Sequence, residues 1–333
     1  MVNSRTSMFG ILALSLLLAA TLFWLRRVSV RNQDHYLTLK SSVGRPASCS
    51  TTGQVTVRVL SQNLWAANFW AAEKLGSKGP NPRARFDGFV RSVTQGKYDV
   101  LLLQELFVLR TAYFFATVDD VAYLTKLLEK AGFLYHTDLL YNLPSTFGQS
   151  SGVAIFSKYP ITEWKGHTFN HYSVKESITS KGFVRAQISI GRSHVNFFST
   201  HMDSSGWEPG VKLEQIKEVG EALKKVTSGA SQTAIVAGDF NIDSLSPEAK
   251  EHYDHLLSTM KQAGVQPIFN SSTPTYHTGT ALDHAFIGGG NISPQDVTSK
   301  AVVKLQSTIA NLPVSDHYGI FFEVKLREDQ VKC

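Results

Sequence analysis

The chain has 333 residues, of which 43% are apolar and 18% are charged, and its formal net charge is +6. This composition excludes a long disordered protein and supplies enough apolar side chains for a sizeable core. Lysine and arginine residues are scattered along the chain, so the charge favours an anionic partner without choosing among a phosphate head group, a membrane surface and nucleic acid.

The two cysteines, Cys49 and Cys333, are too few for a disulfide framework or a zinc site. Two free thiols are favoured over one bridge between the terminal segments.

The segment 8–25 contains no charged residue and reads MFGILALSLLLAATLFWL. Its length and composition predict a single-pass N-terminal membrane anchor. Arg26 and Arg27 follow it directly, which places the C-terminal side in the cytoplasm. The alternative is a secretory signal that is cleaved, and the N-glycosylation triplets that begin at Asn270 and Asn291 favour it.

The chain divides by composition into four parts. Residues 1–30 hold the predicted anchor, and residues 31–53 are polar and read as a linker. A folded domain is expected over residues 54–327, followed by a tail over residues 328–333.

Short apolar or alternating runs predict strands at 55–60, 99–103, 152–156, 184–190, 194–198, 233–237, 282–287 and 318–324. Apolar residues at three- and four-residue spacing predict helices at 83–93, 118–131, 211–226 and 247–263. Strands that alternate with helices, most of them buried, indicate packed sheets covered by helices.

Polar side chains gather where the predicted strands end, at Asn63, Glu105, His201, Asp239, Asn241 and His317. Strand ends that share one rim bring distant side chains into one pocket. Carboxylates, amides and imidazoles together predict a site for a hard metal ion and for proton transfer.

Each of these residues also has a simpler interpretation. Glu105 follows an apolar run, so it is either an oxygen ligand for Mg²⁺ or a loop glutamate that faces solvent. Asp239 and Asn241 stand two residues apart after Gly238, which suits water and phosphoryl binding and also suits a local turn.

Two histidines are candidates for proton transfer. His317 follows Asp316, but neighbouring side chains seldom contact each other, so Asp283 is the better candidate to orient the imidazole. His201 offers a second imidazole, which could donate to a phosphoryl oxygen or to the leaving group.

The ordered set of segments resembles the endonuclease/exonuclease/phosphatase superfamily, also called deoxyribonuclease-I-like. The segments are Gln62-Asn63, Leu103-Gln104-Glu105, Ser151-Gly152-Val153-Ala154-Ile155-Phe156-Ser157, Thr200-His201, Gly238-Asp239-Phe240-Asn241, Leu282-Asp283 and Ser315-Asp316-His317. The resemblance implies an α/β fold, a four-layer α-β-β-α sandwich of two mixed β-sheets flanked by helices.

The resemblance also implies a Mg²⁺ cofactor and roles for single residues. Glu105 would ligate the metal with help from Asn63, and Asp316 would lie near that metal or at a second one. His317, held by Asp283, would be the base that takes a proton from water. Asp239 would orient the water, Asn241 would bind the phosphate, and His201 would stabilise the transition state.

Within the superfamily, the chain is most similar to neutral sphingomyelinases. The similarity lies in Asn63-Leu64-Trp65, in Gln104-Glu105-Leu106-Phe107 followed by Arg110, and in Ser180-Lys181-Gly182 with Glu176 upstream. It implies hydrolysis of sphingomyelin to ceramide and phosphocholine at a membrane surface, with Lys181 in a substrate or regulatory role. A nuclease of the same fold and a non-catalytic lipid- or protein-binding member are the alternatives.

Overall fold

The computed structural model describes residues 54–66, 79–107, 120–140, 150–176, 179–206, 208–229, 232–269, 272–290 and 292–327. Several sequence-based predictions fall outside these ranges. They concern the segment 8–25, the linker 31–53, both cysteines, Arg110 and the asparagines of the two glycosylation triplets.

The prediction of a single-pass membrane anchor is wrong. Within the described ranges, the structure contains no helix long and apolar enough to cross a bilayer.

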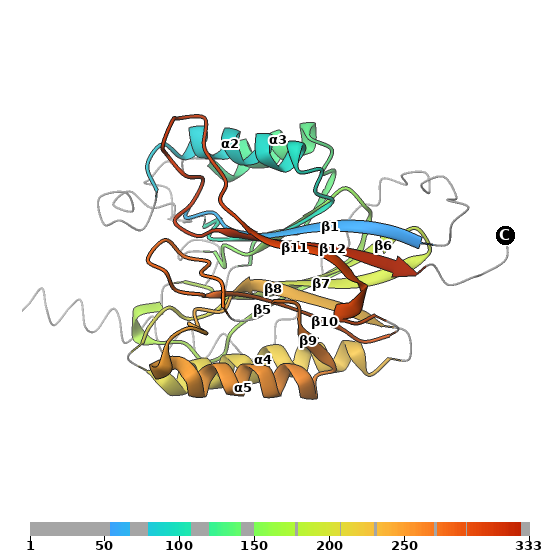
Figure 1. Cartoon of the computed structure of the whole chain (residues 1–333), viewed down its shortest axis with the longest axis vertical. Coiled ribbons are helices and arrows are strands. Elements are labelled where there is room, and N and C mark those ends of the chain that lie inside the picture. The colour runs from blue at the N-terminus through green and yellow to red at the C-terminus, as the bar shows by residue number, and fades with distance from the viewer. Residues whose placement is uncertain are drawn as a thin grey trace, which may run out of the picture.

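Two mixed sheets of six strands each form the centre of the fold (Figure 1). The first sheet has the strand order β11 (Val297–Val303), β12 (Gly319–Arg327), β1 (Gln54–Asn63), β2 (Val100–Gln104), β4 (Ala154–Ser157), β3 (Tyr135–His136). The second has the order β5 (Ile161–Thr168), β6 (Gly182–Ile190), β7 (Ser193–His201), β8 (Thr233–Asp239), β10 (Asp283–Gly288), β9 (Val265–Pro267).

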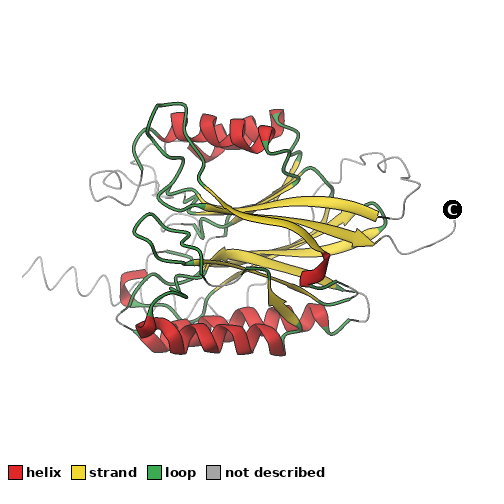
Figure 2. Cartoon of the chain, in the orientation of Figure 1, coloured by secondary structure: helices red, strands yellow, loops and turns green. Residues whose placement is uncertain are grey.

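Helices cover the outer face of each sheet (Figure 2). The first sheet carries α2 (Pro82–Gln95) and α3 (Asp120–Lys130), and the second carries α4 (Pro209–Thr227) and α5 (Lys250–Gln262). Short 3₁₀ turns lie at η1 (Val174–Glu176), η2 (Pro247–Ala249) and η3 (Pro294–Asp296). The four layers confirm the predicted α-β-β-α sandwich.

The pleat of the strands divides their apolar side chains between separate cores. In β2, Val100 and Leu102 lie in the core between the two sheets, whereas Leu101 and Leu103 pack against α2 and α3. A third core fills the space between the second sheet and α4 and α5. Each fully buried aliphatic side chain stabilises the fold by about 1.5–3 kcal/mol, so a central strand needs the continuous apolar run seen in the sequence.

All eight predicted strands and four predicted helices have counterparts in the structure. The sequence reading missed β3, β5, β9 and β11, which are short or stand at sheet edges. Edge strands carry polar and charged residues, because one side of the strand faces solvent. Their apolar periodicity is therefore weak, as in β11, where most residues are exposed.

Candidate active site

The register of the strands brings the candidate residues side by side. In the second sheet, parallel pairing places His201 of β7 beside Asp239 of β8, and antiparallel pairing places Asp239 beside Asp283 of β10. The first sheet supplies Asn63 and Glu105 from the ends of β1 and β2. The amide of Asn63 joins the two sheets, because Nδ2 donates to Glu105 Oε1 at 3.0 Å and to Asp239 Oδ2 at 3.1 Å.

Two glycines let backbones approach closely beside these residues. A Cβ atom at Gly238 would lie 2.1 Å from the carbonyl oxygen of Thr200, so only glycine lets β8 pair with β7 next to His201. A Cβ atom at Gly182 would lie 1.9 Å from the carbonyl oxygen of His167. Packing alone therefore requires the glycine of the Lys181-Gly182 pair.

Two candidate residues adopt the left-handed backbone conformation that side chains other than glycine rarely take. Glu105 has φ 58° and Asn241 has φ 51°. Such conformations cost about 1–3 kcal/mol and persist where surrounding contacts hold them, often at functional sites.

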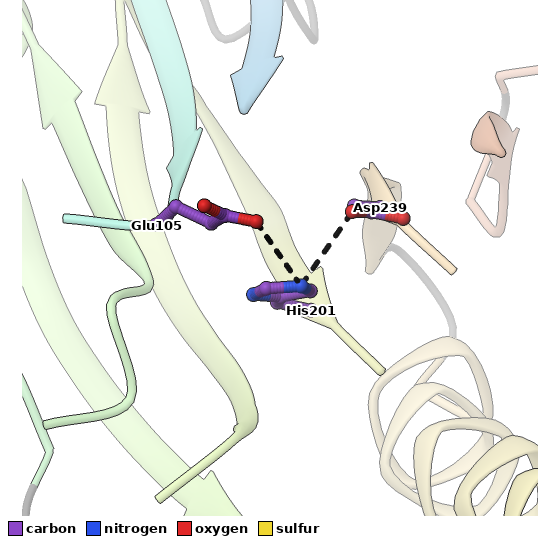
Figure 3. A group of neighbouring side chains, drawn as sticks. All are labelled: Glu105, His201 and Asp239. Carbon is purple, nitrogen blue, oxygen red and sulfur yellow. Dashed lines mark ion pairs between the residues drawn. The ribbon is translucent and has the colours of Figure 1, made fainter. Parts of the chain in front are cut away.

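A group of three side chains offers a place for a divalent cation (Figure 3). His201 Nε2 lies 3.9 Å from Glu105 Oε1 and 3.5 Å from Asp239 Oδ2. Burial, together with the nearby charge of Asp316, raises the pKa of Glu105 to about 7. The two carboxylates are hard oxygen donors, and a cation between them would offset the cost of burying their charge, so the group fits Mg²⁺.

Asn63 and Asp316 lie near this group in different ways. Asn63 faces the two carboxylates with its amide nitrogen, while its amide oxygen accepts the backbone N–H of Trp65 at 2.9 Å. Asp316 is only partly buried, accepts a hydrogen bond from Ser315 and interacts with the hydroxyl of Tyr276. In this arrangement Asn63 orients the carboxylates, and Asp316 adds negative charge from a distance.

His317 and Asp283 form a buried dyad beside Asp239. The Nδ1–H group of His317 donates to Asp283 Oδ2 at 2.9 Å, and Nε2 faces Asp239 Oδ2 at 3.7 Å. The ring of Tyr276 packs against the imidazole at 4.7 Å between centroids. The spacing between Nε2 and Asp239 exceeds a hydrogen bond.

The charges of the dyad depend on its neighbours. Burial alone would lower the pKa of His317, but the carboxylates of Asp283 and Asp239 outweigh burial and raise it to about 10. Burial raises the pKa of Asp283 to about 6. The same carboxylates that would attract a cation therefore also hold a proton on His317.

The second imidazole, that of His201, differs from His317 because its pKa is lowered and not raised. Burial, with the positive charge of Lys181 nearby, lowers the pKa of His201 to about 3, so this ring is neutral at neutral pH. Lys181 is itself buried and pairs with Glu176 Oε1 at 2.9 Å. Glu176, which stands upstream of Ser180-Lys181-Gly182 in the resemblance to neutral sphingomyelinases, is the partner of Lys181 in this ion pair.

Asn241 is held from three sides. Its backbone N–H donates to Asp239 Oδ1 at 2.9 Å, and its side-chain Nδ2 donates to the carbonyl oxygen of Met202 at 3.0 Å. The ammonium of Lys212 donates to the carbonyl oxygen of Asn241 at 2.5 Å. Lys181 also donates to the Met202 carbonyl, at 3.2 Å, so two lysines border this part of the site.

The sequence reading missed two cations that the structure places at the site, Lys212 and Arg85. Arg85 is fully buried, and its guanidinium donates to five backbone carbonyls, those of Pro80, Leu64, Val314, Trp65 and Gly79. It thereby ties the chain just after Asn63 to the chain just before Asp316. A lone arginine in a helix gives no local signal of such a role.

Comparison with protein families identifies the fold and the site together. The model of the endonuclease/exonuclease/phosphatase family matches residues 60–317, which is most of the chain. The chain belongs to this family. The match includes every candidate residue, from Asn63 at the end of β1 to His317.

The proteins to which the chain is similar include bacterial phospholipases, sphingomyelinases and toxins. A phospholipase C of Staphylococcus aureus is 32% identical over 174 residues, which cover 48% of this chain and 53% of that protein. A sphingomyelinase C of Bacillus cereus is 26% identical over 149 residues, covering 42% and 43%. The structure of a mutant beta toxin of Staphylococcus aureus with bound magnesium ions has a TM-score of 0.62 at 21% identity, covering 80% and 99%.

The chain spans about half the length of the curated relatives it matches. The structural similarity, at that identity, establishes the fold alone. None of these bacterial relatives supports the predicted membrane anchor.

Proposed function

We propose that this protein is a metal-dependent phosphodiesterase that hydrolyses the phosphodiester of a phospholipid, with sphingomyelin as the first candidate. The products would be ceramide and phosphocholine. The observation that carries the proposal is the buried His317–Asp283 dyad facing Asp239, within reach of a carboxylate pair that fits a divalent cation. We assign this activity to the folded unit within residues 54–327.

The proposed base is His317. Asp283 fixes the tautomer by accepting the Nδ1 proton, so that Nε2, once it has lost the proton that the raised pKa favours, can take a proton from water near Asp239. The water oxygen then bonds to phosphorus as the bond from phosphorus to the ceramide oxygen breaks, the ceramide oxygen takes a proton from solvent water, and His317 returns its proton to solvent. Asp283 and Asp239 stabilise the imidazolium that results, which is consistent with the raised pKa of His317.

The proposed metal ion is Mg²⁺, with Glu105 as its principal ligand and Asp239 and His201 beside it. When bound, such an ion would act as a Lewis acid toward a phosphoryl oxygen and as a template for the substrate. Asn63 would orient the carboxylate of Glu105, and Asp316 would add charge near the ion.

Asn241 and His201 would contact the phosphate. The neutral ring of His201 can donate one N–H group to a phosphoryl oxygen or to the departing ceramide oxygen. Asn241 would position a phosphoryl oxygen opposite. Lys181 would act mainly by its positive charge, because its ammonium is held by Glu176 and by the Met202 carbonyl.

The rim of the site favours a lipid over nucleic acid as the substrate. Four large hydrophobic side chains are exposed among the described residues, namely Leu134 at 66%, Val174 at 69%, Leu245 at 40% and Ile309 at 43%. Three of them stand on loops at the active-site end of the strands, after β5, β8 and β11. Exposed apolar groups around a site suit an acyl-chain surface, whereas a nucleic-acid rim is rich in cations.

An activity panel tests the proposal. Purified protein is incubated with sphingomyelin, phosphatidylcholine, lysolipids and plasmid DNA, each with Mg²⁺ and with a chelator. Chelator-sensitive release of phosphocholine from sphingomyelin supports the proposal, and preferential nicking of DNA would replace it by the nuclease alternative. Absence of turnover on every ester would favour a non-catalytic binding member.

A further inference from the structure

Lys212 lies next to the proposed catalytic residues but belongs to no motif that the sequence analysis used. It stands in the first turn of α4, is half-buried, and directs its ammonium to the backbone carbonyl of Asn241 at 2.5 Å. Its nearest acidic groups are Asp203 and Asp239. The side chain therefore connects an outer helix to the turn that follows β8.

That turn needs external support. Asn241 adopts a left-handed backbone conformation, which costs less for asparagine than for most side chains but more than for glycine, only two residues after Asp239. Lys212 holds the backbone carbonyl of Asn241 itself, so the hydrogen bond acts directly on the left-handed residue. Without it, the hydrogen bonds to Asp239 and Met202 would have to keep the conformation alone.

The location of Lys212 is unfavourable for the helix itself. A cation in the first turn opposes the positive end of the helix dipole, and burial further disfavours the charge. The first turn of α4 contains no acidic residue to offset it. A lysine at this position lowers helix stability. The hydrogen bond from its ammonium to the Asn241 carbonyl is the stabilising contact that offsets this cost.

Lys181 cannot serve in its place. Its ammonium is buried against Glu176 and reaches the carbonyl of Met202, on the other side of Asn241. Lys212 is the described cation that contacts Asn241 directly.

We propose that Lys212 is a positioning residue, which holds Asn241 in its left-handed conformation and so keeps its amide aligned for the phosphate. This inference rests on the proposed phosphodiesterase function, because Asn241 is the group through which Lys212 acts. Losing a charged hydrogen-bond donor should then lower turnover while substrate binding changes little.

The test uses the full chain and a water-soluble chromogenic phosphocholine diester with Mg²⁺. Lys212→Met should lower kcat by about 10- to 100-fold, as expected for one charge-assisted hydrogen bond, with KM nearly unchanged. Lys212→Arg, which keeps a charged donor, should recover most of the loss. Lys217→Met is the matched control, since Lys217 is exposed on the same helix and pairs with Glu214.

The same test separates action through Asn241 from a general effect on folding. In an Asn241→Ala background, Lys212→Met should cost less than about threefold, because both residues serve one function. An undiminished second loss would overturn the proposal.

A crystal structure of Lys212→Met gives a readout that needs no activity. Asn241 should leave the left-handed conformation while Glu105 and His317 keep their places, and an unchanged Asn241 would overturn the inference. If Lys212→Met does not fold, Lys212→Gln, which keeps a neutral donor, takes its place in both measurements. A wild-type protein without diesterase activity would instead refute the proposed function.

Discussion

Asp239 is the residue on which the site depends most, because it belongs to both groups of converging side chains. One of its oxygens lies near His201 Nε2 and near His317 Nε2, and the amide of Asn63 donates to it. A single buried carboxylate thus faces a neutral imidazole and one whose pKa is raised to about 10. The two imidazoles therefore differ in charge at neutral pH, because their surroundings shift their pKa values in opposite directions.

The dyad gives the first prediction at this scale. His317→Ala should lower turnover by about 10²–10⁴-fold, the usual contribution of a general base, with little change in KM. Asp283→Asn should lose a large part of the same factor, because it no longer fixes the tautomer. Steady-state kinetics on a soluble diester measures both, and a double variant whose loss equals the product of the single losses would show that the residues act independently.

Glu105 gives a prediction about metal and pH. Its pKa rises from 4.5 to about 7 on folding, so the folded state holds a proton that the unfolded chain has lost between those values. The carboxyl group therefore favours folding below pH 4.5, and this contribution disappears as the pH rises through about 7. Because Mg²⁺ needs the ionised form, its affinity should increase from pH 6 to pH 8.

The Glu105→Gln variant separates the effect of the buried charge on stability from the role of the carboxylate as a metal ligand. At pH 8 without metal, the variant should melt higher than the wild type, by about 2–4 °C for each kcal/mol that the buried charge costs. It should also lose most of its stabilisation by Mg²⁺. Differential scanning calorimetry with and without Mg²⁺ measures both, and wild-type-like Mg²⁺ stabilisation of the variant would refute Glu105 as a ligand.

At the scale of elements, the close pairing of β7 and β8 decides how near His201 lies to Asp239. The absence of a Cβ atom at Gly238 permits this pairing, because the carbonyl of Thr200 occupies the space. The strands carry the functional residues at their ends, where the backbone leaves the sheet and side chains can converge from both sheets.

Gly238→Ala should therefore push the two strands apart. Overpacking of this kind costs about 1–3 kcal/mol, and it should lower both the melting temperature and kcat. Gly210→Ala on α4 is the control, since a Cβ atom at that position meets nothing within 4 Å. Unchanged activity in Gly238→Ala would mean that the spacing of His201 and Asp239 matters less than proposed.

At the scale of the whole molecule, the exposed apolar side chains are unevenly distributed. Val174, Leu245 and Ile309 lie on loops at the active-site end, whereas Leu134 precedes β3 at the end where β2 begins. The net charge of +6 would assist contact with an anionic surface but does not by itself select lipid.

This distribution predicts how substrate presentation affects activity. Replacing Val174, Leu245 and Ile309 together by serine should lower hydrolysis of sphingomyelin in vesicles at least about 10-fold, because apolar contact with the lipid is lost. Hydrolysis of the soluble diester should stay within about twofold. Leu134→Ser is the matched control, and vesicle cosedimentation measures binding directly. Equal losses on both substrates would indicate damage to the site rather than to a lipid-contacting rim.

The layers of the fold and most of the candidate residues follow from patterns in the amino-acid sequence. Apolar runs such as Val100–Leu103 can only be buried on both faces, and polar residues at their ends, such as Glu105 and Asp239, mark one rim. Edge strands were missed because solvent removes the need for an apolar pattern. The membrane anchor was predicted wrongly from composition alone, since length and apolarity describe a segment without showing a helix that spans a bilayer.

Which residues contact each other depends on the folded arrangement of the two sheets. The pairing of His317 with Asp283 joins positions 34 residues apart, and the contact of Asn63 with Asp239 joins positions 176 apart. Arg85 and Lys212 gave no local signal, because their roles depend on backbone carbonyls that other segments bring to them. The type of a side chain sets the reactions in which it can take part. Its pKa and its hydrogen-bond partners depend on the surrounding side chains, which come together only when the two sheets have packed.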